Sequence, residues 1–153
     1  PKGRAEIVYE DKKAIIMVDY AHSVDAFENL LTSIPYDYKN KIVLYGCGGD
    51  RDITKRAKIA KTVSKYSSLQ LITDDNPRNE NPKSIRDTLL LNSKNAISIA
   101  NREKAIKYGI KLIKKNGGIL IVAGKGHENT QIIKNKINKF SDQLIIKKYA
   151  KNI

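Results

Sequence analysis

The chain has 153 residues, of which 41% are hydrophobic and 29% are charged. These proportions are typical of one globular domain and exclude a disordered chain. No apolar run approaches the length of a membrane span, and the basic N-terminus lacks the apolar core of a signal peptide. Cys47 is the single cysteine, which excludes an internal disulfide framework and predicts a reducing, cytoplasmic location.

The formal net charge of +13 raises the question of nucleic-acid binding. Most of the basic residues are lysines scattered through the expected helices and the C-terminal third, rather than gathered in one stripe. Lysine, asparagine and isoleucine are all abundant, which indicates a composition bias of the genome. The chain also lacks a basic stripe interleaved with aromatic residues, which would stack on bases. We therefore expect no nucleic-acid partner and keep a basic nucleic-acid-binding α/β module as an alternative.

The predicted elements alternate between strands and helices along the chain. Strands are expected at residues 4–10, 14–18, 42–45, 69–72, 96–99 and 119–122, and the last of these is apolar enough to be central. Helices are expected at residues 26–34, 54–66, 84–91, 102–114 and 142–150, with a hairpin at 131–140 that turns at Asn135-Lys136. This order predicts an α/β fold with a Rossmann-like, doubly wound, mostly parallel sheet, helices on both faces and a C-terminal hairpin.

The loop after the strand at 14–18 holds two aspartates, a tyrosine and one of the two histidines. Ser23 is placed to cap the next helix, so His22 lies near a helix N-terminus, where the dipole and the free N–H groups favour anions. This arrangement predicts a phosphate or nucleotide contact. A solvent-exposed loop histidine is the simpler alternative.

The loop after the strand at 42–45 carries three glycines in four positions, followed by Arg51. Glycine lets the backbone approach a ligand closely, and the planar guanidinium suits a carboxylate or a phosphate. The spacing matches neither the dinucleotide fingerprint nor a Walker A loop. Cys47 has no base beside it in the loop, so we interpret it as a packing residue rather than a nucleophile.

The loop after the strand at 69–72 places two carboxylates, an amide and a guanidinium within five residues. Pro77 fixes its own φ and pushes Asn76 out of the helical region, which holds the polar side chains in place. Acid and base together suit a ligand that carries both charges, such as an amino acid. The alternative is a solvated turn in which Asn79 or Asn81 caps a helix that starts at Pro82.

The loop after the strand at 119–122 contains Gly124 and Gly126, which admit close approach, and Glu128, which could hold an ammonium group. Gly126 stands where a P-loop requires serine or threonine after Lys125, so a P-loop is excluded. Right-handed crossovers place all four loops at one edge of the sheet. We therefore expect the four loops to form a single site.

Four motifs in these loops resemble, in their order and spacing, the C-terminal domain of the Mur ligases. The resemblance covers the chain from Gly3 onward, and the Asp-Asn-Pro-Arg form is similar to that of the members that add meso-diaminopimelate. Members that add lysine have a different residue in place of the arginine, and they remain an alternative. The motifs are Asp19-Tyr20-Ala21-His22, Tyr45-Gly46-Cys47-Gly48-Gly49-Asp50-Arg51-Asp52, Asp75-Asn76-Pro77-Arg78 and Ala123-Gly124-Lys125-Gly126-His127-Glu128.

The resemblance implies a ligase of peptidoglycan precursor synthesis that uses ATP and Mg²⁺. Such enzymes phosphorylate the carboxylate of UDP-MurNAc-L-Ala-D-Glu, and the amino group of the incoming diamino acid attacks the acyl phosphate. Arg51 and Arg78 would hold carboxylates at the distal end of the diamino acid, while Gly124 and Glu128 would bind its amino group and backbone. The residues implied to bind meso-diaminopimelate are Arg51, Asp75, Asn76, Pro77, Arg78, Gly124 and Glu128. Those implied to face the nucleotide are Tyr20, His22 and Asp25, and no metal ligand is expected.

This chain differs from the family pattern in two ways. A whole ligase has an N-terminal domain for the UDP-sugar and a central ATPase domain, where ATP and Mg²⁺ are mainly bound. We expect residues 1–153 to be a single amino-acid-binding domain, monomeric and inactive as a ligase alone, whose partner is that central domain. A stand-alone small-molecule-binding protein is the alternative. In addition, His22-Ser23-Val24-Asp25 replaces the commoner His-Thr-Pro-Asp.

Overall fold

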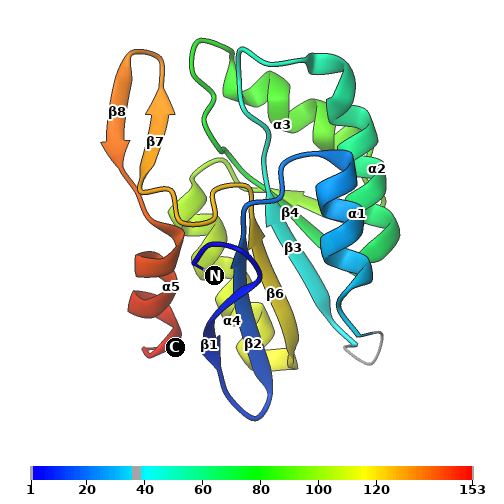
Figure 1. Ribbon diagram of the computed structural model, residues 1–153, viewed down its shortest axis with the longest axis vertical. Coiled ribbons are helices and arrows are strands. Elements are labelled where there is room, and N and C mark those ends of the chain that lie inside the picture. Colours follow the sequence, from blue (N-terminus) through cyan, green and yellow to red (C-terminus); the bar gives the residue numbers. More distant parts are fainter. Residues whose placement is uncertain (1, 36–38, 153) are drawn as a thin grey trace.

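A six-stranded sheet forms the centre of the computed structural model, which describes residues 2–35 and 39–152 (Figure 1). The strands lie in the order β1-β2-β6-β3-β4-β5, and every neighbouring pair is parallel except the edge pair of β1 and β2. A separate antiparallel hairpin joins β7 and β8. The strands are β1 (Glu6–Glu10), β2 (Ala14–Asp19), β3 (Lys41–Tyr45), β4 (Leu69–Ile72), β5 (Ala96–Ser98), β6 (Gly118–Ala123), β7 (Thr130–Ile133) and β8 (Lys136–Lys139).

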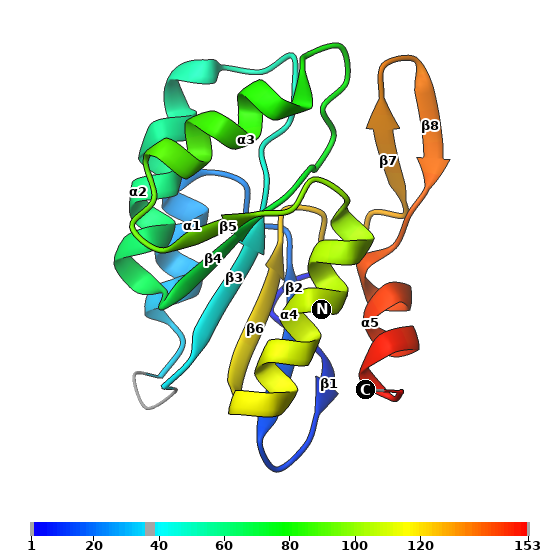
Figure 2. The ribbon, with the colours of Figure 1, turned by 180° about the vertical axis from the view of Figure 1, so that it is seen from behind.

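Helices cover both faces of the sheet, which confirms the predicted doubly wound α/β fold (Figures 1 and 2). In the central strand β6, Ile119 and Ile121 belong to a core cluster with residues of α1, α2 and α3, while Leu120 and Val122 belong to a second cluster with residues of α4 and α5. Among the described residues, no helix combines the length and the apolar character that crossing a membrane requires. The helices are α1 (Val24–Thr32), the short 3₁₀ helix η1 (Ile53–Lys55), α2 (Arg56–Tyr66), α3 (Pro82–Leu91), α4 (Arg102–Asn116) and α5 (Asp142–Ala150).

The carboxyl ends of β2, β3, β4 and β6 meet at one edge of the sheet, because these strands run parallel. The loops that leave them are the four that carry the predicted motifs. The β7–β8 hairpin stands beside this edge and projects away from the sheet (Figures 1 and 2). The topology therefore gathers the motif loops next to the hairpin.

The position predicted for the hairpin turn, Asn135-Lys136, is wrong by one residue. Lys136 pairs with Ile133 across the hairpin, so the turn is formed by Lys134 and Asn135. The backbone N–H of Lys134 donates to the carbonyl of Arg78 at 2.7 Å, and Lys134 takes a positive φ of 53°. A contact with a distant loop thus fixes the register, and no local pattern could reveal it.

The helix starts follow the capping residues. Ser23 caps α1 by accepting a hydrogen bond from the N–H of Ala26, as predicted, although no proline is present. The helix predicted from residue 54 starts with the 3₁₀ helix η1, which Asp52 caps by accepting a hydrogen bond from the N–H of Thr54. The α-helix α2 follows from Arg56. Asn81 caps α3, which confirms the predicted helix cap. The preceding turn is not solvated, because Thr73, Asp75 and Asn76 are buried.

A fully buried ion pair ties α4 and α5 to the site edge of the sheet. Arg102 donates from Nε and Nη2 to the Asp142 carboxylate at 2.9 and 2.8 Å, and neither side chain is exposed. Nη2 also donates to the carbonyl of Ala123 at 3.0 Å, where β6 ends. Burial alone would lower the pKa of the Arg102 guanidinium, but the Asp142 carboxylate outweighs it and raises that pKa.

Replacing Arg102 with methionine should destabilise the domain strongly, because it leaves the Asp142 carboxylate buried without a counter-charge. We expect the free energy of unfolding in urea to fall by about 3–5 kcal/mol, as for other broken buried pairs. The double variant R102M/D142N should recover more than half of the loss. K104M, at an exposed position of the same helix, is the control. A loss for R102M no larger than that for K104M would contradict this role.

Candidate functional site

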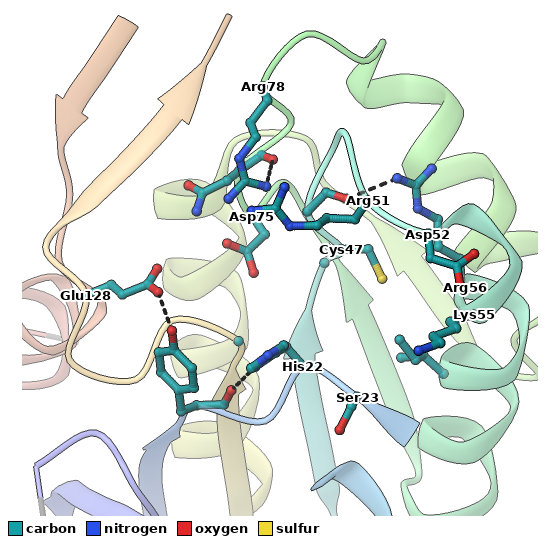
Figure 3. Close-up of a pocket in the computed structure, with 16 residues that line it drawn as sticks. His22, Ser23, Cys47, Arg51, Asp52, Lys55, Arg56, Asp75, Arg78 and Glu128 are labelled. Carbon is teal, nitrogen blue, oxygen red and sulfur yellow. Dashed lines mark hydrogen bonds between the residues drawn. The ribbon is translucent and has the colours of Figure 1, made fainter. Parts of the chain in front are cut away.

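A pocket of about 450 Å³ opens where the four motif loops meet (Figure 3). Eight of the ten residues expected at the site line it, whereas Pro77 and Asp25 do not. Pro77 is buried, and Asp25 lies exposed in the first turn of α1. The lining residues are Tyr20, His22, Ser23, Gly46, Cys47, Gly48, Arg51, Asp52, Lys55, Arg56, Ile59, Asp75, Asn76, Arg78, Gly124 and Glu128.

Direct backbone contacts join the glycine-rich loop to the loop that carries Arg78. The N–H of Gly49 donates to the carbonyl of Asn76 at 2.7 Å, and Nη1 of Arg78 donates to the carbonyl of Gly49 at 2.9 Å. A Cβ atom at position 49 would lie 1.8 Å from the carbonyl oxygen of Pro77. Only glycine therefore allows the two loops to approach this closely.

Arg78 is held in an unusual backbone conformation. Its φ is 52°, in the left-handed region that costs a non-glycine residue free energy. The N–H of Arg78 donates to the carbonyl of Ile132 at 3.1 Å, and its own carbonyl accepts from the N–H of Lys134 at 2.7 Å. These two bonds form a bridge to the β7 strand that stabilises the strained conformation and aims the side chain at the pocket.

A second ion pair reinforces the junction of the same two loops. Arg56 forms two hydrogen bonds of 2.8 Å to the Glu80 carboxylate and a third of 3.0 Å to the carbonyl of Gly48. Glu80 also accepts from the N–H of Asp50 at 2.8 Å. The hydrogen bonds from Arg56 are the main reason that the pKa of Glu80 is lowered.

The ammonium of Lys125 is fully buried and contacts two residues that line the pocket. It contacts Oδ1 of Asp75 at 3.2 Å, Oδ1 of Asn76 at 2.9 Å and the carbonyl of Thr130 at 2.9 Å. The carboxylate of Glu128 is more distant, at 4.0 Å. Lys125 thus connects its own loop to the loop that carries Asp75 and Asn76 and to the start of the hairpin.

Glu128 enters the pocket from the side opposite Arg51 (Figure 3). Tyr20 donates to its Oε2 at 2.9 Å, and this bond is the main reason that the pKa of Tyr20 is raised. The ring of His22 packs edge-on against that of Tyr20, and its Nδ1 lies 2.8 Å from the Tyr20 carbonyl oxygen. Tyr20 therefore connects the loop after β2 to the acid of the pocket.

The remaining part of the pocket lies between the starts of α1 and α2 (Figure 3). His22 and Ser23 line it from one side and the basic Lys55 from the other, where the carboxylate of Asp52 accepts hydrogen bonds from Thr54. No group of three histidine, cysteine, aspartate or glutamate side chains among the described residues could hold a metal ion. This end suits phosphate oxygens but offers no set of metal ligands.

Burial raises the pKa of Cys47 to about 12. At neutral pH its sulfur is therefore a protonated thiol, which is a poor nucleophile. This state supports the interpretation of Cys47 as a packing residue.

Three cations of the site were not anticipated from the sequence. Arg56 and Arg102 looked like ordinary helix residues, and Lys125 served only to exclude a P-loop. Each lies at a helix start or between glycines and finds its acceptors far along the chain. For Lys125, the one available signal was its place as a lone charged residue directly after the most apolar strand.

The family model for the Mur ligase, glutamate ligase domain matches residues 3–126. This chain belongs to the Mur ligase family. It is 41% identical over 150 residues to the UDP-N-acetylmuramoyl-L-alanyl-D-glutamate--2,6-diaminopimelate ligase of Anaplasma marginale, covering 97% of this chain and 31% of that protein. It is 46% identical over 156 residues to the ligase of the same name from Rickettsia montanensis, covering 98% of this chain and 32% of that protein.

Solved structures agree with this membership of the Mur ligase family. A diaminopimelate ligase of the same name superposes with a TM-score of 0.90 at 29% identity, over 99% of this chain and 32% of its own. A folylpolyglutamate synthase from Mycobacterium tuberculosis, 15% identical, reaches 0.65 over 81% of this chain and 29% of its own, which shows a shared fold alone. The chain spans about a third of the length of these relatives.

The Arg56–Glu80 pair should make the stability of the domain depend on pH. Because the folded state lowers the pKa of Glu80, the pair contributes stability above the ordinary pKa of 4.5 and loses it as the pH falls through the lower folded value. The difference in unfolding free energy between the native chain and E80Q should have its greatest value at pH 7 and should decrease below pH 4.5. Urea unfolding at several pH values measures it, with E10Q, at an exposed position, as the control. A difference that does not change with pH would refute the assignment.

Proposed function

We propose that this chain is the amino-acid-binding domain of an ATP-dependent ligase that adds meso-diaminopimelate to UDP-MurNAc-L-Ala-D-Glu in peptidoglycan precursor synthesis. The observation that carries the proposal is the convergence of Arg51, Arg78 and Glu128 in one pocket. The relatives of this chain bear the name of that ligase, which supports the choice of substrate.

The charges in the pocket complement a diamino acid. Lys125 pairs with Asp75, and Arg56 pairs with Glu80, so these four charges are balanced within the protein. Arg51 and Arg78 have no acidic partner among the residues that the structure describes; their guanidinium groups donate to backbone carbonyls. Two free cations suit the carboxylates of the ligand, and the nearby Glu128 suits an ammonium group.

The same arrangement accounts for discrimination against lysine. Lysine has the chain length and the amino groups of diaminopimelate but lacks its distal carboxylate. When lysine occupies the pocket, the guanidinium of Arg78 loses hydration without gaining a charged partner. An unpaired site group of this kind typically allows selectivity of about 10⁴-fold, far more than a missing methylene allows.

In the proposed reaction the protein binds and orients the amino acid. The carboxylates are anchored at one end of the pocket, so the free amino group points toward the activated carboxylate of the second substrate, where it attacks. Fixing two reactants in this way lowers the entropic part of the barrier. Glu128, oriented by Tyr20, holds one ammonium group and leaves the other amine to react.

The nucleotide fits the part of the pocket between the starts of α1 and α2. His22 and Lys55 offer side chains that suit phosphate oxygens. ATP supplies the phosphoryl group for activation of the carboxylate, while Mg²⁺ has no set of ligands among the described residues. We therefore propose that the metal and most of the nucleotide are bound by a central ATPase domain. Residues 1–153 alone are then inactive as a ligase. The complete enzyme works in the cytoplasm.

Replacing Arg78 with alanine should abolish the preference for diaminopimelate in the full-length ligase that contains this domain. We expect kcat/KM for meso-diaminopimelate to fall about 100-fold, because a charge-assisted hydrogen bond to the carboxylate is lost, while the weak use of L-lysine changes little. Product formation with each amino acid measures both values.

The control for this experiment is K111A, at an exposed position on α4, which should leave both rates unchanged. Loss of activity with lysine in proportion to that with diaminopimelate would remove the specificity role of Arg78. Absence of ligation by the native enzyme with either amino acid would overturn the proposed function itself.

A further inference from the structure

The side-chain amide of Asn76 has one possible orientation. The ammonium of Lys125 and the backbone N–H of Ile132 both lie 2.9 Å from the same terminal atom of this side chain. Both groups are donors only, so that atom must be the amide oxygen. The amide nitrogen makes no hydrogen bond to any described residue, although the side chain lines the pocket and the residue is only 9% exposed.

We propose that Lys125 is a positioning residue for recognition of the diamino acid. By holding Oδ1 of Asn76 together with the N–H of Ile132, it presents the amide nitrogen of Asn76 to a carboxylate of the ligand. Asn76 then acts as a donor and never as an acceptor at this point of the pocket. The inference rests on the proposed function and assigns a role to a lysine that never touches the ligand.

The ammonium of Lys125 is suited to this role because all its close partners belong to the protein. It donates hydrogen bonds to Oδ1 of Asn76 and to the carbonyl of Thr130, and it forms an ion pair with Asp75 at 3.2 Å. None of its surface is exposed, so water cannot replace a lost partner. The ammonium therefore holds the amide in one orientation rather than merely neutralising nearby charge.

The β7 strand completes the support of the same loop. Besides the N–H of Ile132, the side chain of Gln131 donates to the carbonyl of Asp75 at 2.9 Å, and Arg78 forms the bridge described above. Lys125 also donates to the carbonyl of Thr130, so it connects the loop after β6 to the hairpin.

The lysine also decides which acid of the pocket remains available. Asp75 is the closer carboxylate, at 3.2 Å from the ammonium, whereas Glu128 is 4.0 Å away and receives its hydrogen bond from Tyr20. Asp75 is thereby committed to the protein, and Glu128 is left to meet an ammonium group of the ligand. One buried cation thus defines a donor at Asn76 and an acceptor at Glu128.

The test compares K125M, D75N and D75N/K125M in the full-length ligase. K125M keeps the length of the side chain but leaves Asp75 buried and unpaired, so it is expected to destabilise the protein. D75N/K125M removes both charges at similar volume and is expected to fold. D75N alone provides the reference for the double variant, so that the effect of losing the lysine is measured without an unpaired charge.

We expect KM for meso-diaminopimelate to be about tenfold or more higher in D75N/K125M than in D75N, because the Asn76 amide then keeps only the N–H of Ile132 and its bond to the carboxylate weakens. KM for ATP and kcat should change less than about twofold, since the effect is confined to amino-acid binding. A purely structural role would not produce this separation. The variant I113A removes a buried side chain of α4 and leaves a cavity in the core. It controls for general destabilisation and should leave KM unchanged.

Equal KM values for meso-diaminopimelate in D75N and D75N/K125M would overturn the positioning role of Lys125. An equal rise in the KM values for ATP and for the amino acid would overturn it as well. If the native ligase accepts no diaminopimelate at all, the proposed function fails, and this inference fails with it. Thermal unfolding of each variant confirms that the comparison is made between folded proteins.

Discussion

A buried ammonium must be surrounded by acceptors, and the site of this protein is organised by that requirement. Lys125 sits without exposure between Asp75, Asn76 and Thr130, so the loops after β4 and β6 and the start of the hairpin have to converge on it. Arg102 and Arg56 apply the same principle on either side, each satisfying an acid and a backbone carbonyl. Three internally satisfied cations therefore hold the loops that leave the sheet.

The internal pairing also determines what the pocket can bind. The acids and bases that pair within the protein are withdrawn from ligand binding. Arg51, Arg78 and Glu128 are left facing one part of the pocket, and Lys55 and Asp52 face the other. A ligand with separated carboxylates and an ammonium group complements this remainder, whereas a polyanion would meet Glu128 as well. The strained backbone of Arg78, supported by its bridge to β7, is one conformational cost of presenting a guanidinium at this position.

Much of the fold could be predicted because its signals are local. Apolar runs such as that of β6 identified the buried strands, and Ser23 and Asn81 marked helix starts. The convergence of four loops followed from the parallel topology. The hairpin register could not be predicted, because it depends on a bond from Lys134 to the distant Arg78. Neither could the role of Lys125, whose partners lie in the loop after β4 and at the start of the hairpin. Long-range pairing of buried charges leaves no pattern in the neighbouring residues.

The most direct test of the account is a ¹H–¹⁵N NMR titration of this 17.2 kDa chain with meso-diaminopimelate and, separately, with L-lysine. Even weak binding to an isolated domain shifts the backbone signals of the residues around the site. The account predicts shifts around Arg51, Arg78 and Glu128 that saturate with diaminopimelate and are much smaller with lysine at equal concentration. Equal shifts with both amino acids, or saturable shifts confined to the outer surfaces of α4 and α5, would contradict it.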